Sequence, residues 1–131
     1  MTEAELWEIL VLVSGGTNNF FGQLIAVVSA YLAVAYFLGN RLTRGQALII
    51  SFLFVVIATT TVAGIYGGVL RAVEFASELQ QIRPDLRFVL AGPMAHLFPG
   101  LSAAVDFGMI PVSLLFMYQI RKNPKLGAPS D

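Results

Sequence analysis

Cysteine is absent from this chain of 131 residues, and histidine occurs once, as His96. Without cysteine the chain can form no disulfide, no thiolate nucleophile and no cysteine-based metal site. A single histidine also excludes a metal site built from several histidines of one chain. We therefore expect no metal and no cofactor, and we interpret His96 as a packing or hydrogen-bonding residue rather than a metal ligand or a pH sensor.

Charged residues are also scarce. They make up 12% of the chain, whereas hydrophobic residues make up 56%. Soluble domains usually carry about twice this share of charge, because they need it to cover their surface. The formal net charge is zero, so the composition gives no reason to expect a nucleic-acid partner. It indicates instead that the lipid bilayer is the surroundings of the chain.

One long stretch carries no charge at all. It covers residues 46–70, between Arg44 and Arg71. The uncharged run of about 26 residues would be about 39 Å long as a helix, which exceeds the roughly 30 Å of a bilayer's hydrocarbon core. The stretch therefore predicts a transmembrane helix.

Two further apolar runs, 20–38 and 101–120, are also long enough to span a bilayer. The first is expected to end at Gly39-Asn40, because glycine and asparagine tolerate the left-handed conformation that follows many helices. The short connection 41–45 makes the first two spans antiparallel neighbours.

The second span is expected to continue beyond the membrane. Apolar residues recur with helical spacing after Arg71, and Pro84 limits the helix because the residue before a proline avoids the α region. We therefore expect one helix from about residue 45 to about residue 82.

The N-terminal segment 1–14 is predicted to form a separate short helix at the membrane interface. Thr2 and Glu5 have the spacing of a capping box, and Trp7 among acidic residues suits the headgroup region. Packing on the outer end of the bundle is the alternative. The segment Ser14–Asn19 is predicted to break the chain before the first span, because it is rich in serine, glycine and asparagine.

The remaining segments lie outside the predicted spans. Residues 71–100 are expected to form an extracytoplasmic extension and cap, since prolines and glycines prevent a long helix in 83–100. Residues 121–131 are expected to be a disordered tail. The predicted fold class is all-α: a single membrane domain, 1–131, with a bundle of three transmembrane helices and a short N-terminal interfacial helix.

Basic residues predict the orientation. The side that holds the 41–45 connection and the C-terminus carries Arg41, Arg44, Arg121, Lys122 and Lys125, all close to span ends. The other side carries only Arg71, Arg83 and Arg87, spread over a longer segment, together with most of the acids. Since cytoplasmic loops are enriched in lysine and arginine, the N-terminus is expected outside and the C-terminus in the cytoplasm.

Small residues recur at every fourth position in all three spans. The expected helix-packing residues are Gly22, Ala26 and Ala30 in the first span, Thr60, Gly64 and Gly68 in the second, and Ala104 and Gly108 in the third. This spacing places each set on one helix face, and in lipid such faces allow the close contact that holds helices together. Two interpretations stay open: packing within one chain, or docking to another subunit or to a second copy.

Asp106 is an ionisable residue well inside a predicted span, which makes it a candidate polar site. Gln23, Tyr66 and Arg71 lie at comparable depth and are its candidate partners. The alternative is structural: if Ser102 caps the third helix, Asp106 lies near the helix start, where the dipole favours an acid.

The segment Ser29–Gln46, with the sequence SAYLAVAYFLGNRLTRGQ, and the following Ile50-Ser51-Phe52-Leu53-Phe54 resemble a pattern found in small bacterial three-span membrane proteins. This resemblance implies a bacterial inner-membrane location but no activity, cofactor or site residue. The topology with its basic tail also resembles that of class I phage holins.

The expected function is that of a small accessory or scaffolding subunit that acts by helix packing. The alternative is a holin-like or other small pore-forming or transport protein, in which Asp106 and the threonines 59–61 would meet water. The sequence contains no nucleophile–base pair, phosphate loop or pair of catalytic carboxylates, so we expect no enzymatic activity.

Overall fold

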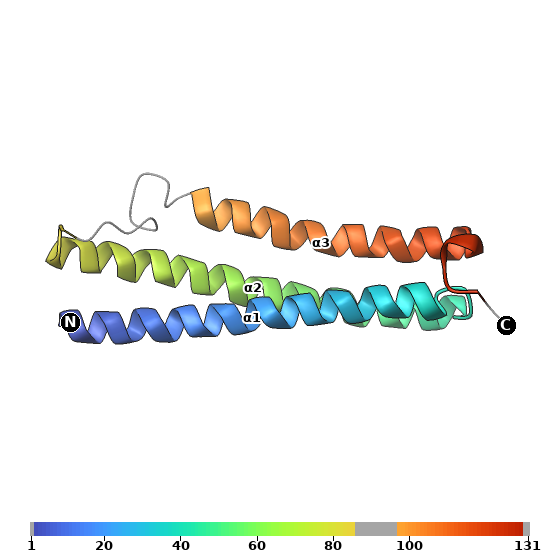
Figure 1. Ribbon diagram of the computed structural model, residues 1–131, viewed down its shortest axis with the longest axis horizontal. Helices are drawn as coiled ribbons and strands as arrows, with labels where there is room; N and C mark the ends of the chain where they lie inside the picture. The colour runs from blue at the N-terminus through green and yellow to red at the C-terminus, as the bar shows by residue number, and fades with distance from the viewer. Residues whose placement is uncertain (1, 86–96, 130–131) are drawn as a thin grey trace.

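The computed structural model describes residues 2–85 and 97–129, and these form three long helices and one short 3-10 helix. The long helices are α1 (Glu3–Leu38), α2 (Arg44–Ile82) and α3 (Leu97–Lys122), and the short one is η2 (Pro124–Leu126). The three long helices lie side by side, with α2 antiparallel to the other two (Figure 1). The chain therefore begins at one end of the bundle and finishes at the other.

All three long helices are long and apolar enough to cross a membrane. Their lengths of 36, 39 and 26 residues correspond to about 54, 58 and 39 Å. The described residues contain no strand. The prediction of an all-α bundle with three membrane-crossing helices is confirmed.

The prediction of a separate N-terminal interfacial helix is wrong, because α1 is continuous from Glu3 to Leu38. The capping box at its start is present: the Thr2 backbone N–H donates to Glu5 Oε2 at 2.8 Å, and the Glu5 backbone N–H donates to Thr2 Oγ1 at 3.3 Å. The expected break at Ser14–Asn19 is helical. In an apolar environment every backbone N–H and C=O must be bonded internally, which outweighs the roughly 1 kcal/mol that a glycine costs in a helix.

Helix α2 begins and ends where local sequence signals indicate. The Thr43 hydroxyl accepts a hydrogen bond from the Gln46 backbone N–H at 3.2 Å, and the Thr43 N–H donates to Gln46 Oε1 at 3.0 Å. This second capping box fixes the start of the helix. The helix ends at Ile82, and Arg83 is its C-cap, immediately before Pro84.

Helix α3 begins at Leu97 rather than at Leu101. Pro99 is compatible with the first turn, where the backbone N–H groups have no partners within the helix. Residues 97–100, expected to belong to an irregular cap, are therefore helical. Residues 86–96 of that cap, including His96, lie outside the described residues.

The α1–α2 connection does not use a left-handed glycine. Gly39 has φ −53° and ψ −37°, which is right-handed helical backbone. A Cβ atom at this position would overlap the Ala35 carbonyl oxygen of α1 and would lie 3.0 Å from Ile120 Cγ2 of α3. Crowding by the preceding turn of α1 and by α3, rather than a left-handed conformation, explains the glycine here.

The expected disorder of the C-terminal tail is wrong for its described residues. The Ala128 backbone N–H donates to the carbonyl of Tyr36 at 3.0 Å. Asn40 Nδ2 donates to the carbonyls of Pro124 at 3.3 Å and Ala128 at 3.4 Å. These bonds hold the tail on the turn between α1 and α2.

The core lies where the three helices meet. The rings of Tyr31 and Phe54 stack with centroids 4.1 Å apart, and the hydroxyls of Tyr31 and Ser51 lie 2.9 Å apart. The remaining buried members of this cluster are aliphatic side chains from all three helices: Leu24, Ala35, Ala58, Val62, Ile65, Ile110 and Met117. Large apolar residues cover the outside, which suits a lipid-facing surface.

Candidate functional site

The small residues of α2 face α1. A Cβ atom at Gly68 would overlap the hydroxyl oxygen of Thr17, and one at Gly64 would lie 3.1 Å from the Phe20 ring. Side chains of α1 therefore pack directly on the α2 backbone because glycine occupies both positions. Thr60 does not share this environment: it is exposed, and its hydroxyl donates to the Val56 carbonyl at 2.8 Å.

The small residues of α1 and α3 are placed differently. Gly22, Ala26, Ala30 and Ala104 are exposed, and Gly108 is half-buried. A Cβ atom at Gly22 or Gly108 would meet nothing within 4 Å. These faces therefore take little or no part in close packing between the described helices.

The exposed small face of α1 includes residues beyond the predicted Gly22, Ala26 and Ala30. At 100° per residue, Ser29 and Ala33 fall on the same side of α1 as Gly22, and both are exposed. We call Gly22, Ala26, Ser29, Ala30 and Ala33 the small α1 face. Testing small residues at spacings of three as well as four would have found it.

Asp106 points into the bundle and is only 3% exposed. Ser102 Oγ donates to Asp106 Oδ2 at 3.1 Å. The condition that Ser102 caps α3 is not met, because the helix begins at Leu97 and Ser102 already lies inside it. The Ser102 hydroxyl instead bonds the carboxylate one turn further along.

The expected partners of Asp106 lie elsewhere. Gln23, Tyr66 and Arg71 are exposed, and within residues 2–85 and 97–129 only Ser102 is hydrogen-bonded to the carboxylate. Gln23 lines a shallow groove between α1 and α2 with Thr60 and others. The structure therefore does not assemble the predicted intramembrane polar site from these four residues.

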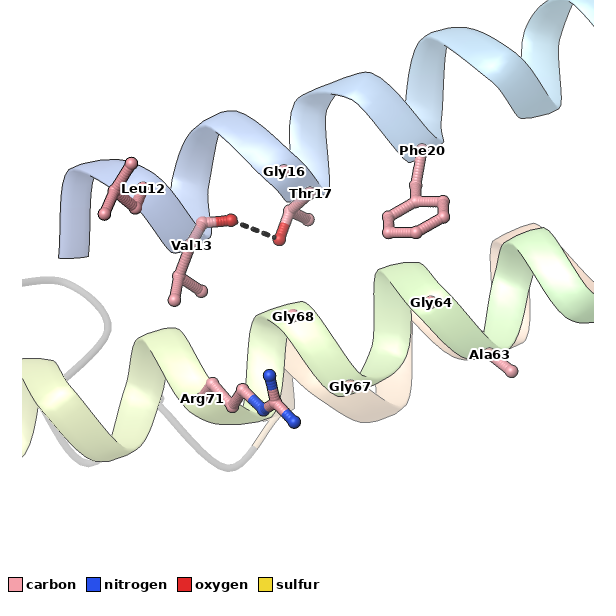
Figure 2. A pocket seen from close by; sticks show the side chains of 10 residues that line it. All are labelled: Leu12, Val13, Gly16, Thr17, Phe20, Ala63, Gly64, Gly67, Gly68 and Arg71. Carbon is pink, nitrogen blue, oxygen red and sulfur yellow. Dashed lines mark hydrogen bonds between the residues drawn. The ribbon is translucent and has the colours of Figure 1, made fainter. Parts of the chain in front are cut away.

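A larger groove lies between the N-terminal half of α1 and the middle of α2, with a volume of about 530 Å³. Figure 2 shows it from close by, with Leu12 and Phe20 on α1 and Ala63 on α2 as apolar lining residues. Gly67 and Gly68 line it on α2, and Arg71 lies at its end. Thr17 Oγ1 donates to the Val13 carbonyl at 2.9 Å, so its hydroxyl is satisfied within α1.

The ends of the bundle differ in charge. At the end where the chain begins, Arg83 Nη1 lies 3.1 Å from Glu3 Oε1, and Arg83 Nη2 lies 2.9 Å from Asp85 Oδ2. At the other end, Arg121 Nη1 donates to the Leu42 carbonyl at 3.0 Å.

No group of three or more histidine, aspartate or glutamate side chains suited to a metal ion occurs in the described ranges.

Comparison of the chain with protein-family models, with curated proteins and with solved structures finds no match.

Proposed function

We propose that this protein is a small accessory or scaffolding subunit of a membrane assembly that acts by packing its helices against another membrane protein or a second copy. The observation that carries the proposal is the small α1 face, which is exposed over residues 22–33. Lipid gives helices no hydrophobic reason to associate, so close contact between small residues is a principal source of affinity. A face of this kind suits a helix from another subunit.

The contrast with α2 supports this proposal. Gly64 and Gly68 already contact α1, through Phe20 and Thr17, within the chain itself. Gly22 on α1 has the same chemistry, yet a Cβ atom there would meet nothing within 4 Å. Among the described residues, one small-residue face thus serves the fold of the chain, and a second is left open by the three helices.

The rival proposal is a pore formed by several copies. Such a pore needs polar side chains on an outer face, where neighbouring copies meet. Asp106 and Thr61 are each 3% exposed, and Thr61 Oγ1 donates to the Ile57 carbonyl at 2.8 Å within its own helix. Thr59 and Thr60 are exposed, but the Thr60 hydroxyl is also bonded within its own helix, to the Val56 carbonyl at 2.8 Å. The burial of Asp106 and Thr61, and the internal bonding of the Thr60 and Thr61 hydroxyls, favour a structural role and hence the accessory subunit.

We further propose a bacterial inner membrane with the C-terminus in the cytoplasm. Arg41, Arg44, Arg121, Lys122 and Lys125 gather at the end of the bundle that holds the tail, and this bias supports the orientation. A reporter active only in the cytoplasm should then work after residue 129 and fail when fused before Thr2. Activity at both termini would overturn the orientation.

Photocrosslinking in the membrane tests the helix-packing proposal. A photoreactive amino acid at Ala26 should give a discrete protein adduct, because Ala26 lies in the small α1 face. The matched control places it at Thr59, which is exposed on α2 outside this face, and should give lipid adducts only. Lipid adducts alone at both positions would overturn the proposal.

The substitution pair Gly22→Leu and Thr59→Leu tests the same face by packing. Leucine at residue 22 should abolish the Ala26 adduct, because its side chain blocks close approach, whereas leucine at residue 59 should leave it unchanged. If the protein instead forms a pore from several copies, its overexpression should dissipate the membrane potential. Intact potential at high membrane levels would eliminate the pore.

A further inference from the structure

The groove between α1 and α2 has room for a chain-like apolar ligand. Gly67 lines it, and a Cβ atom there would meet nothing within 4 Å. From Arg71 back to Ala63, the lining residues of α2 cover about 12 Å of helix. Apart from Arg71 at its end, the lining side chains are apolar except for Thr17, whose hydroxyl is already bonded to the Val13 carbonyl.

Arg71 marks the charged end of the groove. Its side chain is exposed, and it forms no ion pair with any residue in 2–85 or 97–129. Side chains on a helix lean toward its N-terminus, and Figure 2 shows Arg71 extending along α2 toward Gly67. The guanidinium group therefore lies beside the groove, where it can meet an anionic group at the top of a bound chain.

Two acids continue the same face beyond Arg71. Glu74 and Glu78 lie about one and two turns further along α2, within about 60° of Arg71 around the helix axis. Glu74 is exposed and Glu78 half-buried, and neither forms an ion pair with a described residue. Going outward from the groove, α2 thus presents apolar lining residues, then the cation Arg71, and then the anions Glu74 and Glu78.

The depth of this series matches a lipid headgroup. Arg71 lies about 27 residues, or about 40 Å, along α2 from Arg44, and a bilayer measures about 40–45 Å between its outer headgroup surfaces. When Arg44 lies among the headgroups of one leaflet, Arg71 lies among those of the other. The groove then extends from the headgroups into the hydrocarbon core.

We infer that the groove binds one acyl chain of an ethanolamine phospholipid, with the phosphate on Arg71 and the ammonium group on Glu74 and Glu78. The guanidinium group matches the phosphate oxygens with paired donors. A primary ammonium group donates hydrogen bonds to carboxylates, which a choline headgroup cannot do. A glycerol headgroup leaves the lipid with a net negative charge that both acids repel.

The inference is tested by native mass spectrometry of the full chain in neutral detergent. Ethanolamine, choline and glycerol phospholipids with identical dioleoyl chains are titrated separately. The ethanolamine lipid should bind with 1:1 stoichiometry and with a dissociation constant about tenfold lower than those of the other two lipids. One charge-assisted hydrogen bond supplies an affinity difference of this size. Tighter binding of the glycerol lipid, or equal binding of all three, would overturn the inference.

Matched variants assign the parts of the site. Arg71→Gln should weaken all three lipids about tenfold, whereas Arg44→Gln, at the other end of α2, should change none. Glu74→Gln combined with Glu78→Gln should remove the ethanolamine preference and leave choline-lipid binding unchanged. If Arg71→Gln and Arg44→Gln behave alike, the phosphate is not held at this groove.

Gly67→Leu tests the acyl chain. Its side chain enters open space in the groove and should abolish 1:1 lipid binding, whereas Gly45→Leu, also in open space but at the other end of α2, should not. Retained binding in Gly67→Leu, with unchanged helicity, would overturn the inference. So would a wild-type dimer without lipid that Gly67→Leu dissociates, because a second copy would then occupy the groove.

Discussion

Helices α1 and α2 are held together in a different way from α3. The first pair meets along its length, from the Glu3–Arg83 ion pair through the glycine contacts of Gly68 and Gly64 to the Tyr31–Ser51 hydroxyls. Helix α3 joins this pair through large side chains such as Met117 and, at the basic end, through Arg121. Of its small residues, Ala104 is exposed, and a Cβ atom at the half-buried Gly108 would meet no described atom within 4 Å.

The difference shows that a small-residue pattern has no single meaning within one molecule. On α2 it lets α1 side chains lie directly on the helix backbone, so a larger side chain there must separate the two helices. On α3 the contacts are made by large side chains, so truncation rather than enlargement should weaken them. The two interfaces should therefore respond to opposite kinds of substitution.

The largest effect is expected for Gly68→Leu. Even a Cβ atom at this position would overlap the Thr17 hydroxyl, and the added side chain must push α1 away. The expected loss is about 3 kcal/mol in the free energy of unfolding, near the upper end for overpacked sites. Unfolding in mixed micelles followed by circular dichroism measures it. Gly22→Leu is the control, and an equal loss there would remove the distinction between the two glycine faces.

Met117→Ala should have the next largest effect, because it truncates a core contact of α3. The expected loss is about 2 kcal/mol, at the lower end for methionine in a core, since micelle and core are similarly apolar and only packing is lost. Truncating the exposed Leu115 to alanine should cost far less. If Met117→Ala and Leu115→Ala unfold at the same detergent composition, α3 does not rely on large side chains for its packing.

Asp106→Leu should cost about 1 kcal/mol, because it removes the acceptor of the Ser102 hydroxyl. Asp106→Asn retains an oxygen acceptor and should cost less. Both effects act within α3, since Ser102 and Asp106 belong to the same helix. Unfolding in mixed micelles measures the free energy of unfolding of both Asp106 variants against that of the wild type. A large loss in Asp106→Asn would show that the charge itself joins α3 to the other helices.

The smallest effect concerns the exposed ion pairs at the end of α1 and α2. Hydrogen bonds from Arg83, at 2.9 Å to each carboxylate oxygen, hold the pKa of Asp85 below its usual range. A carboxyl group with a lowered folded-state pKa adds stability above its unfolded pKa of about 3.9. That stability disappears as the pH falls through the lower folded-state value.

The thermal midpoint of the wild type minus that of Asp85→Asn should therefore be small and positive at pH 6. It should shrink as the pH falls below about 4, and it should be reduced by salt because the pair is exposed. A difference that grows toward low pH would contradict the assignment of the pair.

Much of the fold follows from sequence because it depends on local quantities. Length without charge predicts the spans, and Pro84 predicts the end of α2. The same local rules failed at Ser14–Asn19, where turn-forming residues lie inside α1. They also failed at Ser102, since the prolines and glycines before it suggested a later start for α3. In an apolar environment an unbonded backbone N–H or C=O group costs so much free energy that weak local signals for a helix break do not interrupt the helix.

The sequence by itself determined which residues share a helix face, because the helical repeat is set by backbone geometry. Only the tertiary structure decided which face meets a neighbour. It placed Gly64 and Gly68 against α1, left Gly22 open, and set Arg71 beside a groove rather than beside Asp106. The physical reason is that a helix can rotate about its own axis, and so turn any face toward a neighbour, without breaking its backbone hydrogen bonds. The choice among neighbours therefore depends on how three surfaces fit together in space.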